Sequence, residues 1–104
     1  MRDLIDLVRE FNEDRGWRRF HTPRSLILSL CGEVGELAQL FRWHTSGRKL
    51  SPAKRKSVEA EIADIFIFLF SLCVELNIDP DKIVRDTLQD NAKRFPVKQG
   101  EHDE

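Results

Sequence analysis

The sequence has few cysteines, no long apolar run and no excess of charge of either sign. Cys31 and Cys73 form no CxxC pair, so we expect two buried free thiols in a reducing, cytoplasmic setting. The longest apolar stretch, residues 65–74, is too short to span a bilayer, and charges within residues 1–4 argue against a signal peptide. With 17 basic and 18 acidic residues in total, we expect neither a membrane nor a nucleic-acid polymer as partner.

The apolar residues that are present follow a helical period throughout. They recur at i, i+3, i+4 and i+7, and no segment alternates with period two, so the fold class is all-α. Three prolines each follow a capping residue, in Thr22-Pro23, Ser51-Pro52 and Asp79-Pro80, as at helix starts. These signals and the apolar stripes predict helices at 2–14, 23–44, 52–77 and 80–94.

The chain length of 104 residues allows one domain, which we place at residues 1–97, and residues 98–104 are expected to be a disordered tail. The two long helices, 23–44 and 52–77, are joined by a short loop and should lie antiparallel. We therefore predict a four-helix-bundle-like architecture. Its core would be modest, so a homo-oligomer, dimer or tetramer, is expected to bury more apolar surface.

Two acidic couplets lie within the apolar stripes of these long helices. Glu33-x-x-Glu36 and Glu61-x-x-Asp64 each place both carboxylates on one helix face. Folding the helices against each other would bring three or four carboxylates to one point, where their repulsion is costly without a cation. A hard divalent metal prefers oxygen ligands, and magnesium is usually held by carboxylates, waters and substrate phosphates. The pattern thus predicts a Mg²⁺ site that serves phosphate chemistry.

Other interpretations of the couplets exist. A di-iron or di-manganese bundle is disfavoured, because Glu-x-x-His pairs are absent at these positions. A solvated E-x-x-E face paired with Lys or Arg is common, and Glu59, which lies off the couplet face, is expected to be such a residue. The corresponding function of another class is a non-catalytic helical interaction module.

Aromatic and cationic residues near the couplets suggest contacts to a nucleotide. Trp43 and Phe68 follow the couplets at helical spacing and could stack on a base, or else simply fill the core. At the end of the last helix, Asn91, Lys93 and Arg94 could contact phosphates. Alternatively, the two cations could simply interact favourably with the negative end of the helix dipole.

Taken in order, these motifs resemble a known family, the MazG-like all-α nucleoside triphosphate pyrophosphohydrolases, and within it the small dCTP pyrophosphatases. The similarity covers residues 11–96. It comprises Trp17-x-x-Phe20-His21-x-Pro23-Arg24, Gly32-Glu33-Val34-Gly35-Glu36-Leu37-Ala38, Leu40-Phe41-x-Trp43, Glu61-x-x-Asp64 and Asn91-x-x-Arg94-Phe95-Pro96.

The resemblance implies hydrolysis of a nucleoside triphosphate between the α and β phosphates, with Mg²⁺ as cofactor. It implies dimers or tetramers whose active site is built partly across subunits. The positions that match the family's metal ligands are Glu33, Glu36, Glu61 and Asp64. Those that match its base pocket are Trp17 and Trp43, with His21 nearby.

The substrate implied is dCTP or a modified dCTP, with dUTP or another damaged nucleotide as the alternative. Either Glu33 or Glu36 could accept the proton of the attacking water, and the sequence does not separate these roles. The chain departs from the family where a Tyr is common, which is Phe68 here, and where a Lys is frequent, which is Thr87 here. Base selectivity therefore does not follow from the resemblance.

Overall fold

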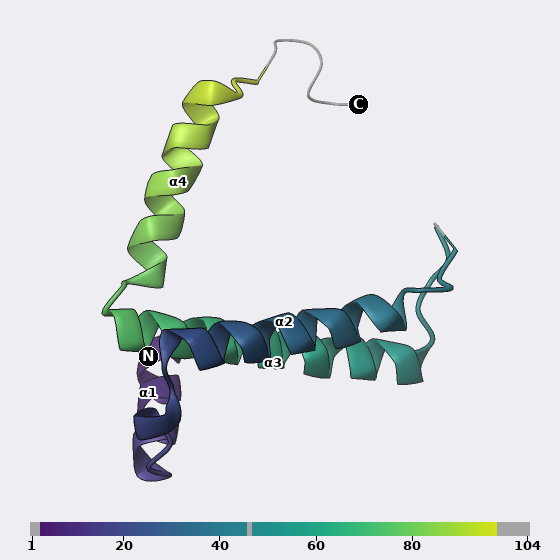
Figure 1. Ribbon diagram of the computed structural model, residues 1–104. Helices are drawn as coiled ribbons and strands as arrows, with labels where there is room; N and C mark the ends of the chain where they lie inside the picture. The colour runs from purple at the N-terminus through teal and green to yellow at the C-terminus, as the bar shows by residue number, and fades with distance from the viewer. Residues whose placement is uncertain (1–2, 46, 98–104) are drawn as a thin grey trace.

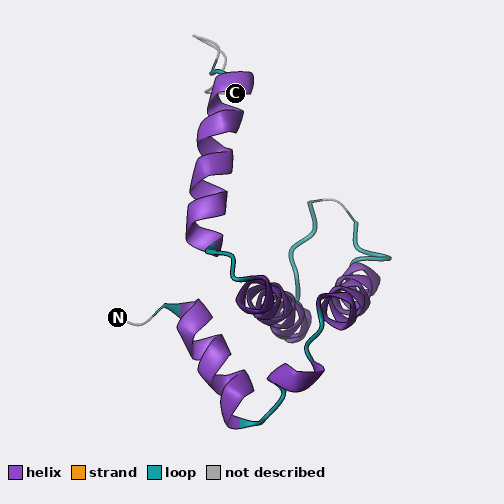
Figure 2. Cartoon of the chain, turned by 60° about the vertical axis from the view of Figure 1, so that its left-hand side comes forward, coloured by secondary structure: helices purple, strands orange, loops and turns teal. Residues whose placement is uncertain are grey.

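The computed structural model describes residues 3–45 and 47–97, and every regular element in these ranges is a helix. Residues 1–2 and the predicted tail at 98–104 lie outside the described residues. The predicted all-α class is confirmed (Figure 2). The elements in chain order are α1 (Leu4–Asp14), the short 3₁₀ helix η1 (Arg18–Phe20), α2 (Pro23–Leu40), α3 (Pro52–Leu76) and α4 (Pro80–Arg94).

Local capping chemistry sets where three of the helices begin. The side chain of Thr22 accepts a hydrogen bond from the Ser25 amide at 3.1 Å, which starts α2. Ser51 Oγ accepts from the Lys54 amide at 3.2 Å, and Asp79 Oδ1 accepts from the Asp81 amide at 3.0 Å. Each cap satisfies a backbone N–H that the first turn leaves free, and the proline at the first helical position has no N–H of its own that needs a partner. The three predicted starts are confirmed.

The predicted end of the second helix is wrong. α2 ends at Leu40 and not at residue 44, because its last amides bond three residues back instead of four. Phe41 N donates to Ala38 O at 3.1 Å and Arg42 N donates to Gln39 O at 3.2 Å, which tightens the chain into a turn. Trp43 therefore lies beyond the helix, in the α2–α3 turn, and does not continue the face that carries Glu36.

α2 and α3 form a hairpin, and α1 and α4 extend from one end of it as two arms (Figure 1). α2 and α3 lie antiparallel along each other, and α1 packs on α3 near the N-terminal end of α2. α4 projects away from the hairpin in both views and does not pack along any other helix (Figures 1 and 2). The radius of gyration is 17.5 Å, whereas a compact chain of this length would have about 13 Å. The bundle-like packing of all four helices is thus not reached within one chain.

The buried part of the described chain is small. Its buried apolar residues are Leu26, Val58 and Val74, and a buried polar pair, Asn12 and Ser71, lies between α1 and α3. Many large apolar side chains on every helix stay exposed, among them the predicted stripe of the last helix, Ile83, Val84 and Leu88.

One further expectation concerns the two cysteines. The prediction that both thiols are buried is wrong within this chain. Cys31 is exposed and Cys73 is half-buried, and both are free. In the part of the chain that the structure describes, no helix combines the length and apolar character that crossing a membrane requires.

Candidate metal centre

The α2–α3 hairpin brings acidic side chains from both of its helices together. Glu33 on α2 and Glu61 and Asp64 on α3 each offer a carboxylate oxygen, and these oxygens lie within 4.8 Å of one another. We call these three residues the acidic cluster. The spacing of three on α3 turns Glu61 and Asp64 towards the same side, and the antiparallel packing of α2 supplies Glu33 opposite them.

Two oxygens of the acidic cluster lack a hydrogen-bond partner although they are buried. They are Glu33 Oε2 and Glu61 Oε2. Buried acceptors are normally satisfied, because an unmet one costs about 1–3 kcal/mol. A donor set made only of carboxylate oxygens fits a hard divalent cation, which would take up these lone pairs. The residues present therefore fit a hard divalent metal ion.

The protonation of Glu61 reflects the same crowding. A side-chain hydrogen bond with Glu33 is the largest cause that raises the pKa of Glu61, to about 7, from an ordinary value of 4.5. Desolvation and the negative charges of Glu36 and Glu33 raise this pKa further. The crowding of these carboxylates therefore favours the protonated form of Glu61, and a divalent cation at the same position would relieve the same repulsion.

Glu36 lies beside the acidic cluster. Glu36 is an exposed residue, and its charge and a side-chain hydrogen bond both raise the pKa of Glu61, although its oxygens are not among the three that lie within 4.8 Å of one another. The structure thus brings together three of the four acids of the couplets. By contrast, Glu59 lies 3.3 Å from Arg55 in an exposed i, i+4 ion pair, as expected of a solvated acid.

The aromatic candidates occupy different surroundings. Trp17 packs edge-on against Phe11, with ring centroids 5.5 Å apart, at the corner between α1 and η1. His21 follows η1 and has a buried Nδ1 without a hydrogen-bond partner. Phe68 is half-buried on α3. The Trp43 side chain is 84% exposed, and the Arg42 guanidinium lies over its ring at 5.1 Å.

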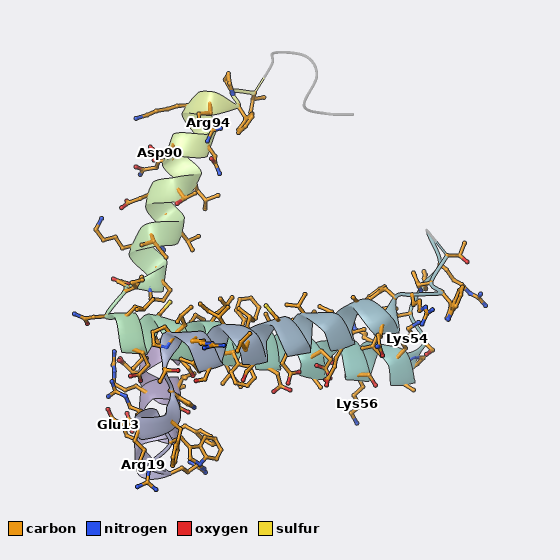
Figure 3. All side chains as sticks on the ribbon, in the orientation of Figure 1. Glu13, Arg19, Lys54, Lys56, Asp90 and Arg94 are labelled. Carbon is orange, nitrogen blue, oxygen red and sulfur yellow. The ribbon has the colours of Figure 1, made fainter. Side chains whose placement is uncertain are left out.

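The polar candidates on α4 do not meet the acidic cluster within one chain. Asn91, Lys93 and Arg94 are exposed. Figure 3 shows Arg94 at the far end of α4, well away from the α2–α3 hairpin.

Sequence reasoning missed a cavity at the turn of the hairpin. Its lining includes Trp43, His44, Arg48, Lys49 and Lys54. The signal that could have revealed it is the absence of any acid between Glu36 and Glu59, where six Lys and Arg residues occur.

Comparison with known proteins agrees with this geometry. A family model described as the MazG-like family matches residues 28–104. The chain is 38% identical to dCTP pyrophosphatase 1 of Homo sapiens over 101 residues, which is 93% of this chain and 59% of that protein. It is also 38% identical to dCTP pyrophosphatase 1 of Bos taurus, over 93% of this chain and 60% of the relative. The chain thus spans about three-fifths of the length of these curated relatives.

A solved structure extends the likeness to the fold. The crystal structure of a pyrophosphatase from Archaeoglobus fulgidus superposes with a TM-score of 0.71 and 34% sequence identity. The match covers 90% of each chain.

Proposed function

The chain belongs to the MazG-like family, and from this membership we propose that it is a nucleoside triphosphate pyrophosphohydrolase. It would cleave a nucleoside triphosphate between the α and β phosphates and release the monophosphate and pyrophosphate. The relatives named dCTP pyrophosphatase 1 support dCTP or a modified dCTP as substrate. The alternative is the same chemistry on dUTP or another damaged or non-standard nucleotide.

The observation that carries this proposal is the acidic cluster with its two unpartnered buried oxygens. Glu33, Glu61 and Asp64 would hold Mg²⁺ between α2 and α3. A bound Mg²⁺ supplies charge neutralisation at the phosphate oxygens and orients a water molecule. Such an ion would also relieve the repulsion that otherwise keeps a proton on Glu61.

Glu36 is our candidate for the general base. Glu36 is an exposed residue beside the acidic cluster, and a side chain in this position is open to a water molecule. In the proposed step, Glu36 accepts a proton from the water as the water oxygen bonds to the α phosphorus. The bridging P–O bond then breaks, and pyrophosphate leaves with that bond's electron pair. A general base of this kind contributes about 10²–10⁴-fold to a rate.

The remaining candidates would position the nucleotide. Trp17, Trp43 and Phe68 are proposed to contact the base, with His21 beside them. Asn91, Lys93 and Arg94 are proposed to hold the outer phosphates. Because α4 points away from its own hairpin, the last three residues would act on the cluster of a second copy, which makes a homo-oligomer part of the proposal. The exposed apolar residues of α4 support the same assembly. The two free cysteines support the cytoplasm as the compartment.

A substrate panel tests the proposed function. The pure protein is incubated with Mg²⁺ and each standard or modified deoxynucleoside triphosphate, and the products are separated. We expect monophosphate and pyrophosphate, with dCTP or a modified dCTP hydrolysed fastest. Release of orthophosphate and a diphosphate would contradict the cleavage position. If no nucleotide is hydrolysed and none shifts the melting temperature, the chain is an interaction module and not an enzyme.

A further inference from the structure

The α2–α3 turn gathers positive charge at one end of the molecule. The chain as a whole has a net charge of −1, yet residues 37–58 contain no acid. The cations in this range are Arg42, Arg48, Lys49, Lys54, Arg55 and Lys56. Figure 3 shows Lys54 and Lys56 at the turn end of the hairpin, opposite the end from which α4 projects. Like charges gathered in this way are unfavourable unless an anion joins them.

Several of these cations share one cavity. It measures about 350 Å³, and the residues that give it charge and an aromatic wall are Trp43, His44, Arg48, Lys49 and Lys54. We call these five residues the turn pocket. Ligand pockets typically measure about 300–1,000 Å³. The turn pocket is therefore large enough for a short polyphosphate chain.

The cations of the turn pocket are not neutralised by neighbouring acids. Among the described residues, the ion pairs at this end of the hairpin reduce to Arg55 with Glu59, at 3.3 Å. Lys54 has an aromatic neighbour, since its ammonium lies 6.0 Å from the Phe41 ring centroid. Arg48, Lys49 and Lys54 are thus available to an anion, with Trp43 exposed beside them.

The turn pocket lies on the same helix as the acidic cluster. Lys54 precedes Glu61 by seven residues on α3, which corresponds to two helical turns and about 10 Å along the axis. The acidic cluster repels a polyphosphate that approaches it, whereas the turn pocket attracts it. A basic region beside such a cluster raises the local concentration of an anionic substrate, and on-rates rise by about 10–10³-fold.

We propose that the turn pocket captures the triphosphate chain of the incoming nucleotide before that chain reaches the acidic cluster. This inference rests on the proposed function, because it takes the nucleoside triphosphate as the anion. Arg48 and Lys49 provide the charge, Lys54 directs the chain along α3 towards Glu61, and Trp43 reports on the arrival of the ligand. The pocket acts on binding and not on the chemical step.

The first test uses inorganic tripolyphosphate without metal. In EDTA, the acidic cluster repels this probe, so binding reports on basic side chains, and variants of Arg48 and Lys49 isolate the part played by the turn pocket. The chain has two tryptophans, and the Trp17→Phe variant leaves Trp43 as the sole fluorophore. We expect tripolyphosphate to change its fluorescence and raise the melting temperature, and the double change Arg48→Gln with Lys49→Gln to weaken the apparent affinity at least about tenfold. The matched control, Lys82→Gln with Arg85→Gln, removes the same charge from α4 and should bind like the parent.

The second test measures turnover with Mg²⁺ and dCTP over a range of salt concentrations. We expect Arg48→Gln with Lys49→Gln to lower kcat/KM about tenfold through KM, and to flatten its dependence on salt. Absence of turnover in the parent protein would reject the proposed function. Tripolyphosphate binding would still test whether the turn pocket binds a polyphosphate. If tripolyphosphate does not bind, or if the double variant and the α4 control behave alike in either test, the turn pocket does not capture the substrate.

Discussion

Glu33 and Glu61 meet across the α2–α3 interface, and each buries one carboxylate oxygen that has no hydrogen-bond partner. Two acids this close repel each other unless a proton or a cation lies between them. Without a metal ion, protonation of Glu61 reduces this repulsion, which is why its pKa is raised to about 7. The α2–α3 hairpin thus places carboxylate oxygens where a positive charge would relieve their repulsion.

Glu61→Gln should abolish most turnover while the helices remain folded. The amide removes a negative ligand from the acidic cluster, and we expect kcat/KM to fall by about 100-fold or more. Far-ultraviolet circular dichroism should be unchanged. Glu59→Gln is the matched control, because Glu59 lies two residues away in an exposed ion pair with Arg55. Equal activity of both variants would remove Glu61 from the site.

The stability of the metal-free protein should depend on pH through Glu61. Its pKa in the folded chain is about 7, above the ordinary value of 4.5. The folded state thus binds this proton more tightly than the unfolded state does, so this contribution to stability is fully present below 4.5 and is lost as pH rises through 7.

Thermal melts in EDTA between about pH 5 and pH 8 measure this effect. We expect the melting temperature of the parent to fall across that range relative to Glu61→Gln, which lacks the titration. Added Mg²⁺ should stabilise the parent more at the alkaline end, because no proton then has to be displaced. Parallel curves for the parent and Glu61→Gln would contradict the shared-proton description.

The buried hydrogen bond between α1 and α3 should be important for stability. Asn12 Nδ2 donates to Ser71 Oγ at 2.9 Å, and both side chains are 2% exposed. Ser71→Ala leaves a buried amide donor without its partner, so we expect the free energy of unfolding to fall by about 1–3 kcal/mol. Ser57→Ala is the control, because the Ser57 hydroxyl is exposed and makes a longer bond of 3.4 Å to Ala53 O. Urea denaturation that shows the same small loss for both would contradict this assignment.

The exposed apolar face of α4 should hold copies of the chain together. Val84 and Leu88 are 55% and 61% exposed, on a helix that packs along no other helix of its own chain. We expect sedimentation to show a dimer or tetramer, and Leu88→Glu to shift it towards monomer. Gln89→Glu adds the same charge at the neighbouring exposed position and should leave the assembly intact. A parent protein that sediments as a monomer would refute the proposed assembly.

Local chemistry explains which features were predictable from sequence. The starts of α2, α3 and α4 follow from Thr22, Ser51 and Asp79, whose side chains cap the next turn without help from the rest of the fold. The acidic cluster was predictable for a similar reason, because helical spacing and a short connection limit where the couplets can lie. These features depend on neighbours along the chain or on one helix pair.

The features that sequence did not specify depend on competition between hydrogen bonds or on packing between distant elements. No glycine or proline marks the end of α2 at Leu40, and a switch to shorter hydrogen bonds ends it there. Helical spacing does not specify which of the four acids place their oxygens within 4.8 Å of one another, so the metal role expected of Glu36 stays a prediction. α4 packs along no other helix of the described chain, so no contact between apolar stripes could be used to place it.

The most direct test of the central claim is an anomalous diffraction measurement on crystals grown with Mn²⁺, which prefers the same oxygen ligands as Mg²⁺. We predict an anomalous peak between α2 and α3, with Glu33, Glu61 and Asp64 as its protein ligands. A map without a peak there, with these three side chains turned to solvent, would contradict the account.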